Sequence, residues 1–280
     1  MTKKTLLLLT GFFVFVIGVG YLFSYLFSSV EILYFAVIFS VAMSFVSYWF
    51  SDKIVLKMAR AREIKESENP EIYSIAKHLC QKANLPLPKI YLIRESQPNA
   101  FATGRDKNHA VIALTQGLLD KLSREEIEGV IGHELSHVKN KDMLLQTIIV
   151  VLAGFVAVLS RMFIWSSIFG GRRRGGGHLA LFGIIAAILA PIGAMLIQMA
   201  VSRKREFLAD ASAAGLTGNP EGLALALQKI ASDKTPMKSA QEATAHLYIS
   251  NPFRGQNISK LFMTHPPVEE RVKALRGLRI

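Results

Sequence analysis

Long uncharged apolar runs dominate the pattern of this chain. Four of them are about twenty residues long, the length that an α-helix needs to cross a hydrocarbon core roughly 30 Å thick. They are Thr5 to Phe27, Ile32 to Phe50, Met143 to Ser160, and Leu179 to Ala200. Because a very short polar turn separates the first two, they predict an uncleaved helical hairpin rather than a signal sequence. We therefore expect four apolar transmembrane helices.

Basic residues at the ends of the runs predict their orientation, because Lys and Arg beside membrane spans favour the cytoplasmic side. Lys3 precedes the first run and Lys53 follows the second, so both ends of this hairpin are expected in the cytoplasm. Lys141 precedes and Arg203 follows the second hairpin, so its two ends are also expected in the cytoplasm. The loop between the third and fourth runs disagrees, because Gly170 to Gly177 contains three arginines. The sequence thus leaves open whether the second hairpin fully spans.

Composition narrows the class of protein. Hydrophobic residues make up 51% of the 280 residues and charged residues 19%, whereas soluble proteins carry about 25% charged residues. An ordinary cytosolic enzyme and a disordered chain are both disfavoured. The net charge of +12 fits nucleic acid or an anionic lipid surface. The arginine-rich loop lacks interleaved aromatic residues and lies between membrane runs, so we expect a lipid bilayer as partner and no nucleic acid.

The residues outside the apolar runs form two stretches, 51–142 and 201–280. Together they have the usual size of one domain assembled around an inserted hairpin. We therefore divide the chain into a transmembrane hairpin (1–50), a first domain segment (51–142), a second apolar hairpin (143–200) and a second domain segment (201–280). Cys80 is the only cysteine, which excludes an intrachain disulfide and a cysteine-rich metal cluster.

Local patterns in these two stretches predict mostly α-structure with a small β-sheet. A helical pattern runs from Ile72 to Ala83, and two extended runs follow at Ile90 to Ile93 and Ala110 to Leu114. Ser123 and Glu126 form a capping-box pattern that begins another helix. That helix can continue to the third apolar run.

The predicted helix after Ser123 carries the pattern H-E-x-x-H at His133, Glu134 and His137. Residues four apart lie on one helix face, so both imidazoles can reach a single ion. Glu134 lies close to that face, where it can hold a water bound to the metal. The alternative is two histidines on a solvated helix face, but the defined helix start and the adjoining membrane run favour a metal site.

A zinc site built on two histidines needs a third protein ligand and an open position for water. No third histidine follows at the metzincin spacing. Glu206 and Asp210 stand four apart after the fourth run, so one can bind zinc while the other accepts the free ring N–H of a ligating histidine. An antiparallel hairpin would bring Glu206 back to the same side of the membrane as His137. The alternative is an exposed, charge-balanced face beside Arg203 and Arg205.

Four motifs occur in one order along the chain: H-E-L-S-H at 133–137, E-F-L-A-D at 206–210, Asn99 to Gly104 upstream, and His265-Pro-Pro with Glu270-Arg271 downstream. In this combination the chain resembles the HtpX membrane metalloproteases, relatives of the CAAX prenyl protease. The resemblance covers essentially the whole sequence. It implies a gluzincin-type zinc endopeptidase with a zincin-like protease domain that faces the cytoplasm at a bacterial cytoplasmic (inner) membrane.

The resemblance also implies roles for the residues of the metal motifs. His133, His137 and Glu206 would bind one zinc ion per chain. Glu134 would be the general base that accepts a proton from water activated by zinc. Asp210 would hold a ligating histidine in place.

Four further residues acquire roles through the same resemblance. Asn99 and Ala100 would lie on an edge strand that pairs with substrate, and His265 and Arg271 would line the active site. His265 is a plausible donor to the developing oxyanion. Each has a plainer alternative: Asn99 and Ala100 in a simple turn, His265 as a loop residue capping the next helix, and Arg271 on a helix surface.

We therefore predict a membrane-bound zinc endopeptidase that cleaves misfolded or damaged membrane proteins in protein quality control. One alternative is a peptidase for lipidated or prenylated peptides, although four spans are too few for a large intramembrane chamber. Another is a non-catalytic membrane adaptor with a vestigial metal site, which an intact Glu134 disfavours. The sequence indicates neither the natural substrates nor the oligomeric state.

Overall fold

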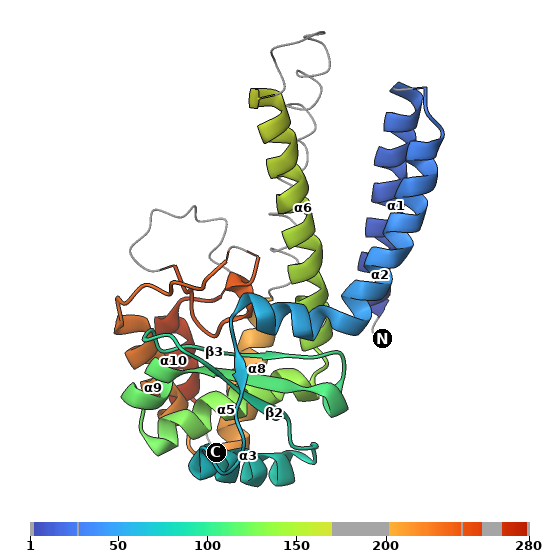
Figure 1. The fold of residues 1–280 in the computed structure, drawn as a ribbon. Helices are drawn as coiled ribbons and strands as arrows, with labels where there is room; N and C mark the ends of the chain where they lie inside the picture. The colour runs from blue at the N-terminus through green and yellow to red at the C-terminus, as the bar shows by residue number, and fades with distance from the viewer. Residues whose placement is uncertain (1–2, 27, 170–201, 242, 254–264, 279–280) are drawn as a thin grey trace.

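The structure is a computed structural model that describes residues 3–26, 28–169, 202–241, 243–253 and 265–278. Its first two helices, α1 (Lys3–Leu26) and α2 (Glu31–Met58), form a hairpin that stands out from the rest of the molecule (Figure 1). Thr5–Tyr25 and Glu31–Met58 are long and apolar enough to cross a membrane, with mean hydropathies of 2.5 and 1.9. The predicted first hairpin is confirmed. Its large apolar side chains face outward, as lipid contact requires.

Four transmembrane helices were expected, and the described part of the chain contains two candidate spans, or three if the bent pair of α5 and α6 counts as one. The third apolar run forms α6 (Met143–Phe169), but protein encloses the first half of this helix. Ile148 and Leu152, for example, are fully buried and pack with Leu8 and Phe12 of α1. The apolar residues of that half therefore form part of a protein core. The fourth run, 179–200, and the arginine-rich loop lie outside the described residues.

A bend separates α6 from the preceding helix, α5 (Arg124–Lys139). Both helices together pass the test for a span, but they meet at 86°. The break falls at residues 140–142, where Lys141 has a left-handed backbone with φ of 59°. Thus α5 lies within the soluble part, and α6 rises away from it (Figure 1).

A four-stranded mixed sheet lies beside α5, in the order β1-β2-β4-β3. The strands are β1 (Arg62–Glu63), β2 (Lys89–Ile93), β3 (Ala100–Thr103) and β4 (Val111–Thr115). β2 and β4 are parallel, and both β1 and β3 are antiparallel to their neighbours. The two extended runs expected from the sequence are the central strands. β3 is the edge strand nearest α5 and α6, so the fold is mostly helical with a small mixed sheet.

Further helices surround this unit: α3 (Pro70–Ala83), α4 (Gln116–Lys121), α8 (Arg203–Thr217), α9 (Pro220–Ser232) and α10 (Val268–Arg276), with 3₁₀ turns η1 (Lys107–His109) and η2 (Ala245–Leu247). Local chemistry sets several helix starts. The Asn69 side chain accepts a hydrogen bond from the Ile72 amide before α3, and Asn219 caps α9 in the same way. A proline follows each of these caps at the first helical position, where its missing N–H costs no hydrogen bond.

The main core joins residues from before and after the apolar insertion. Ile131 and Leu135 of α5 pack with Ala213 of α8 and Leu227 of α9. The two stretches predicted to form one domain therefore share a core, although the boundaries of the four predicted regions stay predictions. This packing brings α8 against α5, which places their acidic and imidazole side chains face to face.

Candidate metal centre

Helix α5 positions the H-E-x-x-H side chains inside the protein. Its start is a capping box, as the sequence predicts: the Glu126 carboxylate accepts from the Ser123 amide at 2.8 Å, and the Ser123 hydroxyl accepts from the Glu126 amide at 3.5 Å. His133, Glu134 and His137 expose only 1%, 2% and 6% of their surface. The alternative of two histidines on a solvated helix face is therefore wrong.

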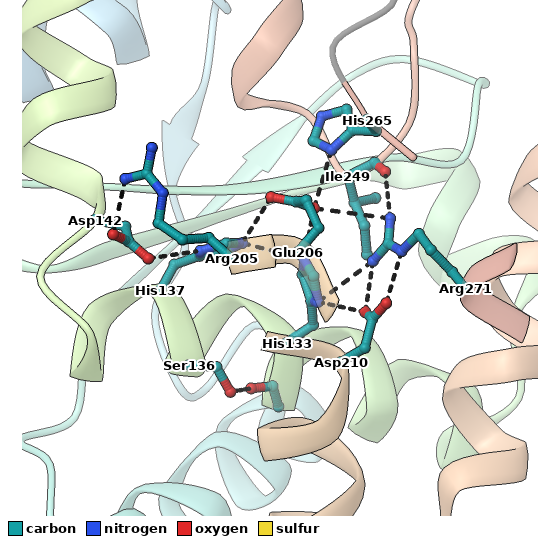
Figure 2. A network of polar contacts seen from close by, with 11 residues as sticks. His133, Ser136, His137, Asp142, Arg205, Glu206, Asp210, Ile249, His265 and Arg271 are labelled. Carbon is teal, nitrogen blue, oxygen red and sulfur yellow. Dashed lines mark hydrogen bonds and ion pairs between the residues drawn. The ribbon is translucent and has the colours of Figure 1, made fainter. Parts of the chain in front are cut away.

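Helix α8 brings Glu206 to the two histidines. The Nε2 atoms of His133 and His137 lie 3.2 Å apart, and the Glu206 carboxylate oxygens lie 3.7 Å and 3.6 Å from them. Figure 2 shows the three side chains converging from α5 and α8. Glu206 is 1% exposed, so the alternative of a solvated charge-balanced face does not hold for it.

These three side chains fit a metal ion. Their donor atoms lie within 4.8 Å of one another, and all three residues are buried. A tetrahedral zinc ion with bonds of about 2.0–2.1 Å separates its ligand atoms by roughly 3.3 Å. The observed separations of 3.2–3.7 Å are close to that value. Two imidazole nitrogens and a carboxylate oxygen are also a donor set that zinc prefers.

Asp210 lies one turn beyond Glu206 on α8 and contacts the opposite side of His133. Its Oδ1 is 2.9 Å from His133 Nδ1, so it accepts the ring N–H and leaves Nε2 free for a metal. Arg271 of α10 donates to both oxygens of Asp210, at 2.8 Å from Nε and 2.6 Å from Nη2. Arg271 also donates to the Ile249 carbonyl at 3.3 Å. It is buried, so the alternative of a surface arginine does not hold.

His265 approaches the centre from the segment before α10. Its Nδ1 lies 3.0 Å from the Glu206 carboxylate (Figure 2). Its Nε2 is buried and has no hydrogen-bond partner among the residues that the structure describes. The structure therefore places His265 beside a predicted ligand, with one ring nitrogen free.

Two residues at the centre were missed by reasoning from the sequence. Asp142, in the bend after α5, lies 3.7 Å from His137 Nδ1 through Oδ2. Its Oδ1 accepts from Arg205 of α8 at 2.9 Å. The sequence signal is weak, because Asp142 reaches back to His137 only through the left-handed turn at Lys141. Each histidine thus has its own carboxylate, Asp210 or Asp142.

Burial and charge set the protonation of these groups. Burial lowers the pKa of His133 to about 4, which keeps its ring neutral at pH 7. Burial also lowers the pKa of His137, but Asp142 and Glu206 outweigh it and raise the value to about 8. Burial opposes ionisation of Glu206 too, yet His265 and His137 hold its pKa well below the usual range. The pocket therefore offers negative charge to a cation between the rings.

Glu134 has the pKa of a general base that works near neutral pH. Burial raises its pKa to about 7, and the nearby His137 and the Ala102 backbone amide oppose the rise. Ala102 belongs to the edge strand β3. Glu134 thus lies between the metal ligands and this strand.

Asn99 and Ala100 lie at the start of β3, where their bonds go to a later part of the same chain. The Ala100 carbonyl accepts from the Ile249 amide at 2.9 Å. Asn99 donates to the Ser250 carbonyl at 2.8 Å and accepts from the Ser250 amide at 3.3 Å. The stretch is an edge strand rather than a simple turn, and residues 249–250 fill its first part.

The class of protein follows from α5, whose buried H-E-x-x-H side chains meet a glutamate from a neighbouring helix. This arrangement defines a metallopeptidase. The apolar α1–α2 hairpin adds that the enzyme is attached to a membrane.

Comparison with known proteins identifies the family. The sequence profile of peptidase family M48 matches residues 66–279, so the chain belongs to that family and is a metalloprotease. It is 52% identical over 251 residues to a protease HtpX homolog of Syntrophobacter fumaroxidans, covering 87% of this chain and 88% of the relative. A protease HtpX homolog of Thermococcus kodakarensis is 48% identical over 281 residues, covering 99% and 94%.

A solved structure supports the fold. The crystal structure of S. mikatae Ste24p matches with a TM-score of 0.51 at 19% identity. The match covers 97% of this chain and 64% of that one, so this chain spans less than two thirds of the Ste24p length. The expected resemblance to the HtpX proteases is confirmed, and a non-catalytic adaptor is set aside in favour of a metalloprotease.

Proposed function

We propose that the chain is a zinc-dependent endopeptidase of the cytoplasmic membrane that cleaves misfolded or damaged membrane proteins. In this proposal the protein is multi-pass, and a zincin-like domain faces the cytoplasm. The convergence of His133, His137 and Glu206 beside Glu134 is the observation that carries the proposal. The basic residues at the ends of the first hairpin support the cytoplasmic orientation.

One zinc ion per chain would be held by His133, His137 and Glu206. When bound, zinc acts as a Lewis acid that polarises a carbonyl and lets water lose a proton near neutral pH. Asp210 accepts the Nδ1 proton of His133 and so keeps the lone pair of Nε2 available. Arg271 balances the buried charge of Asp210.

The protein moves one proton through Glu134. Its carboxylate accepts the proton from the attacking water and passes it to the leaving amine of the cleaved bond, a role worth about 10²–10⁴ in rate. The pKa of about 7 suits both halves of this exchange. His265 is assigned as the donor to the developing oxyanion, through the ring nitrogen that does not contact Glu206.

An extended peptide would add to the edge of β3. Main-chain pairing accepts many side chains, which suits an enzyme that clears damaged proteins. Asn99 and Ala100 would take part by exchanging their bonds to residues 249–250 for bonds to the substrate. The spans next to this edge would keep membrane-attached substrates nearby, and they favour membrane proteins as the natural targets.

The test is proteolysis of unfolded casein by the full chain in detergent, together with metal analysis. The parent should contain about one zinc per chain and cleave casein, and a chelator should abolish cleavage. Glu134→Gln should retain zinc and lose activity. Glu128→Gln is the matched control, because Glu128 lies on the same helix and pairs with His78 rather than with the centre.

Two results would contradict the proposal. Full activity in Glu134→Gln would remove the assigned base, and a parent that binds no zinc would remove the metal. The natural substrate class is tested separately, by comparing cleavage of a destabilised membrane protein with its folded parent in the same bilayer. Equal cleavage of both would argue against quality control while leaving the peptidase chemistry intact.

A further inference from the structure

A groove lies where the end of α2 meets the loop that joins β3 to β4. Its volume is about 490 Å³, and its apolar wall is made by Phe45, Trp49 and Phe50 of α2. Its basic wall includes Lys53 and Arg105. We call it the junction groove. No residue of the metal centre lines it.

The basic and aromatic side chains of the junction groove are in contact. The Arg105 guanidinium lies over the Trp49 ring, 4.6 Å from its centroid, and Lys53 lies 5.5 Å from the centroid of Phe50. Arg105 also contacts Asp106 through Nε and His109 through Nη2. Its Nη1 group has no partner among the residues that the structure describes. Arg105 is thus oriented with N–H donors to spare.

A second cavity of about 350 Å³ shares Arg105 and extends the basic surface. It adds Lys107, Lys139 and Lys141, which are exposed and form no ion pair within the described ranges. The acidic side chains in the two linings are Asp52 and Asp106. Basic groups therefore outnumber acidic ones, and the potential here attracts an anion.

The position of the junction groove indicates which anion. Phe45 and Trp49 are 57% and 44% exposed, one to two turns before Asp52 and Lys53 end the uncharged stretch of α2. Aromatic rings at such an end lie at the level of lipid headgroups, and basic residues there attract anionic lipids. A phosphate ester with apolar chains matches both walls. We propose that the junction groove binds an anionic glycerophospholipid. Its phosphate lies between Lys53 and Arg105, and the part of an acyl chain nearest the headgroup lies along the aromatic wall.

Trp49 provides the measurement, because it forms part of the proposed site. The chain has two tryptophans, so the change Trp165→Phe leaves Trp49 as the reporter. This full-length protein is reconstituted in mixtures of phosphatidylglycerol and phosphatidylcholine, with one lipid or the other brominated on its acyl chains. At equal mole fraction, brominated phosphatidylglycerol should quench Trp49 as if enriched about 30-fold, the effect of two basic contacts. Equal quenching by the two lipids would overturn the proposal.

Variants separate a site from general surface charge. Lys53→Gln combined with Arg105→Gln should reduce the enrichment to about one, and Arg105→Lys should retain it. The control pair is Lys234→Gln with Lys238→Gln, which removes equal charge from exposed positions outside the groove. Enrichment that survives in the first pair, or falls equally in the control pair, would refute the assignment. Loss of enrichment in millimolar inorganic phosphate would show a general phosphate site instead and would also refute it.

Discussion

At the metal centre, the two histidines are supported by carboxylates at different distances. Asp210 contacts His133 at 2.9 Å, whereas Asp142 lies 3.7 Å from His137, too far for a direct hydrogen bond. Arg271 and burial act oppositely on Asp210: burial raises the pKa, but the guanidinium outweighs it and brings the value to about 2. Asp210 is therefore ionised at neutral pH and can accept the Nδ1 proton of His133, which leaves Nε2 of that ring without a proton.

Removing the charge of Asp210 should weaken metal binding. Asp210→Asn should raise the Kd for zinc about 10- to 100-fold, because the amide holds the His133 ring less firmly. Asp142→Asn should have a smaller effect because its contact is longer. Competition with a chromophoric chelator measures both constants. Asp120→Asn, an exposed change, serves as control; an unchanged Kd for Asp210→Asn would refute the role of Asp210.

His246 should make the free energy of unfolding depend on pH. It is buried near the Gln146 carbonyl, and burial lowers its pKa to about 4. Between pH 6.5 and 4 the unfolded chain binds a proton that the folded chain does not, so stability falls as pH falls, by about 3 kcal/mol in total. Above pH 6.5 both states are neutral and the contribution is constant.

The measurement is denaturant unfolding of the metal-free full chain in detergent at pH 7 and pH 4. His246→Gln should be about 3 kcal/mol more stable relative to the parent at pH 4 than at pH 7. His78→Gln, at an exposed position, is the control. The same pH dependence in His246→Gln and the parent would exclude this role for His246.

Among the helices, α5 is held by close backbone contacts that its sequence does not reveal. A Cβ at Gly129 would lie 2.7 Å from the Leu223 amide nitrogen of α9, so the two helices meet where a side chain is absent. A Cβ at Gly215 of α8 would meet nothing within 4 Å. Both residues are helical glycines, and only one of them is needed for packing.

The two glycines therefore predict opposite effects on unfolding. Gly129→Ala should lower the free energy of unfolding by about 1–3 kcal/mol, because α9 must shift. Gly215→Ala should raise it by about 0.5–1 kcal/mol, because alanine favours the helix and has room. Unfolding in detergent measures both. A stabilising Gly129→Ala would show that α5 and α9 are further apart than described.

Across the whole molecule, α2 belongs both to the membrane and to the soluble part. Val41 is 54% exposed on the apolar stretch, whereas Val55, on the same helix, is fully buried. Val55 packs with Phe101 of β3 and Val111 of β4. The sheet that carries the proposed substrate edge is thus covered by the end of a candidate transmembrane helix.

The same change at these two valines should separate the two environments. Val55→Ala should cost about 2 kcal/mol, because it leaves a cavity in a protein core. Val41→Ala should change stability by less than about 0.5 kcal/mol, because lipid fills the space. Thermal unfolding in bilayers or micelles provides the comparison. Equal costs would mean that the end of α2 does not pack on the sheet.

Local patterns along the chain were enough to predict much of the fold. The first hairpin, the capped start of α5, the two central strands and the ligand candidates on α5 and α8 all follow from patterns among near neighbours along the chain. Such patterns are readable because helix and strand periods, caps and motif spacing act between near neighbours. They do not show what surrounds an apolar run.

Only the tertiary structure decided the remaining features. The burial of the first half of α6 in protein, the contact of Asp142 with His137, and the filling of the β3 edge by residues 249–250 join segments that are distant or bent relative to each other. Apolar residues look alike in sequence whether lipid or protein covers them, because both exclude water. Hydrogen-bond partners far apart along the chain leave no local spacing to detect, so they emerge only when the helices and strands are packed.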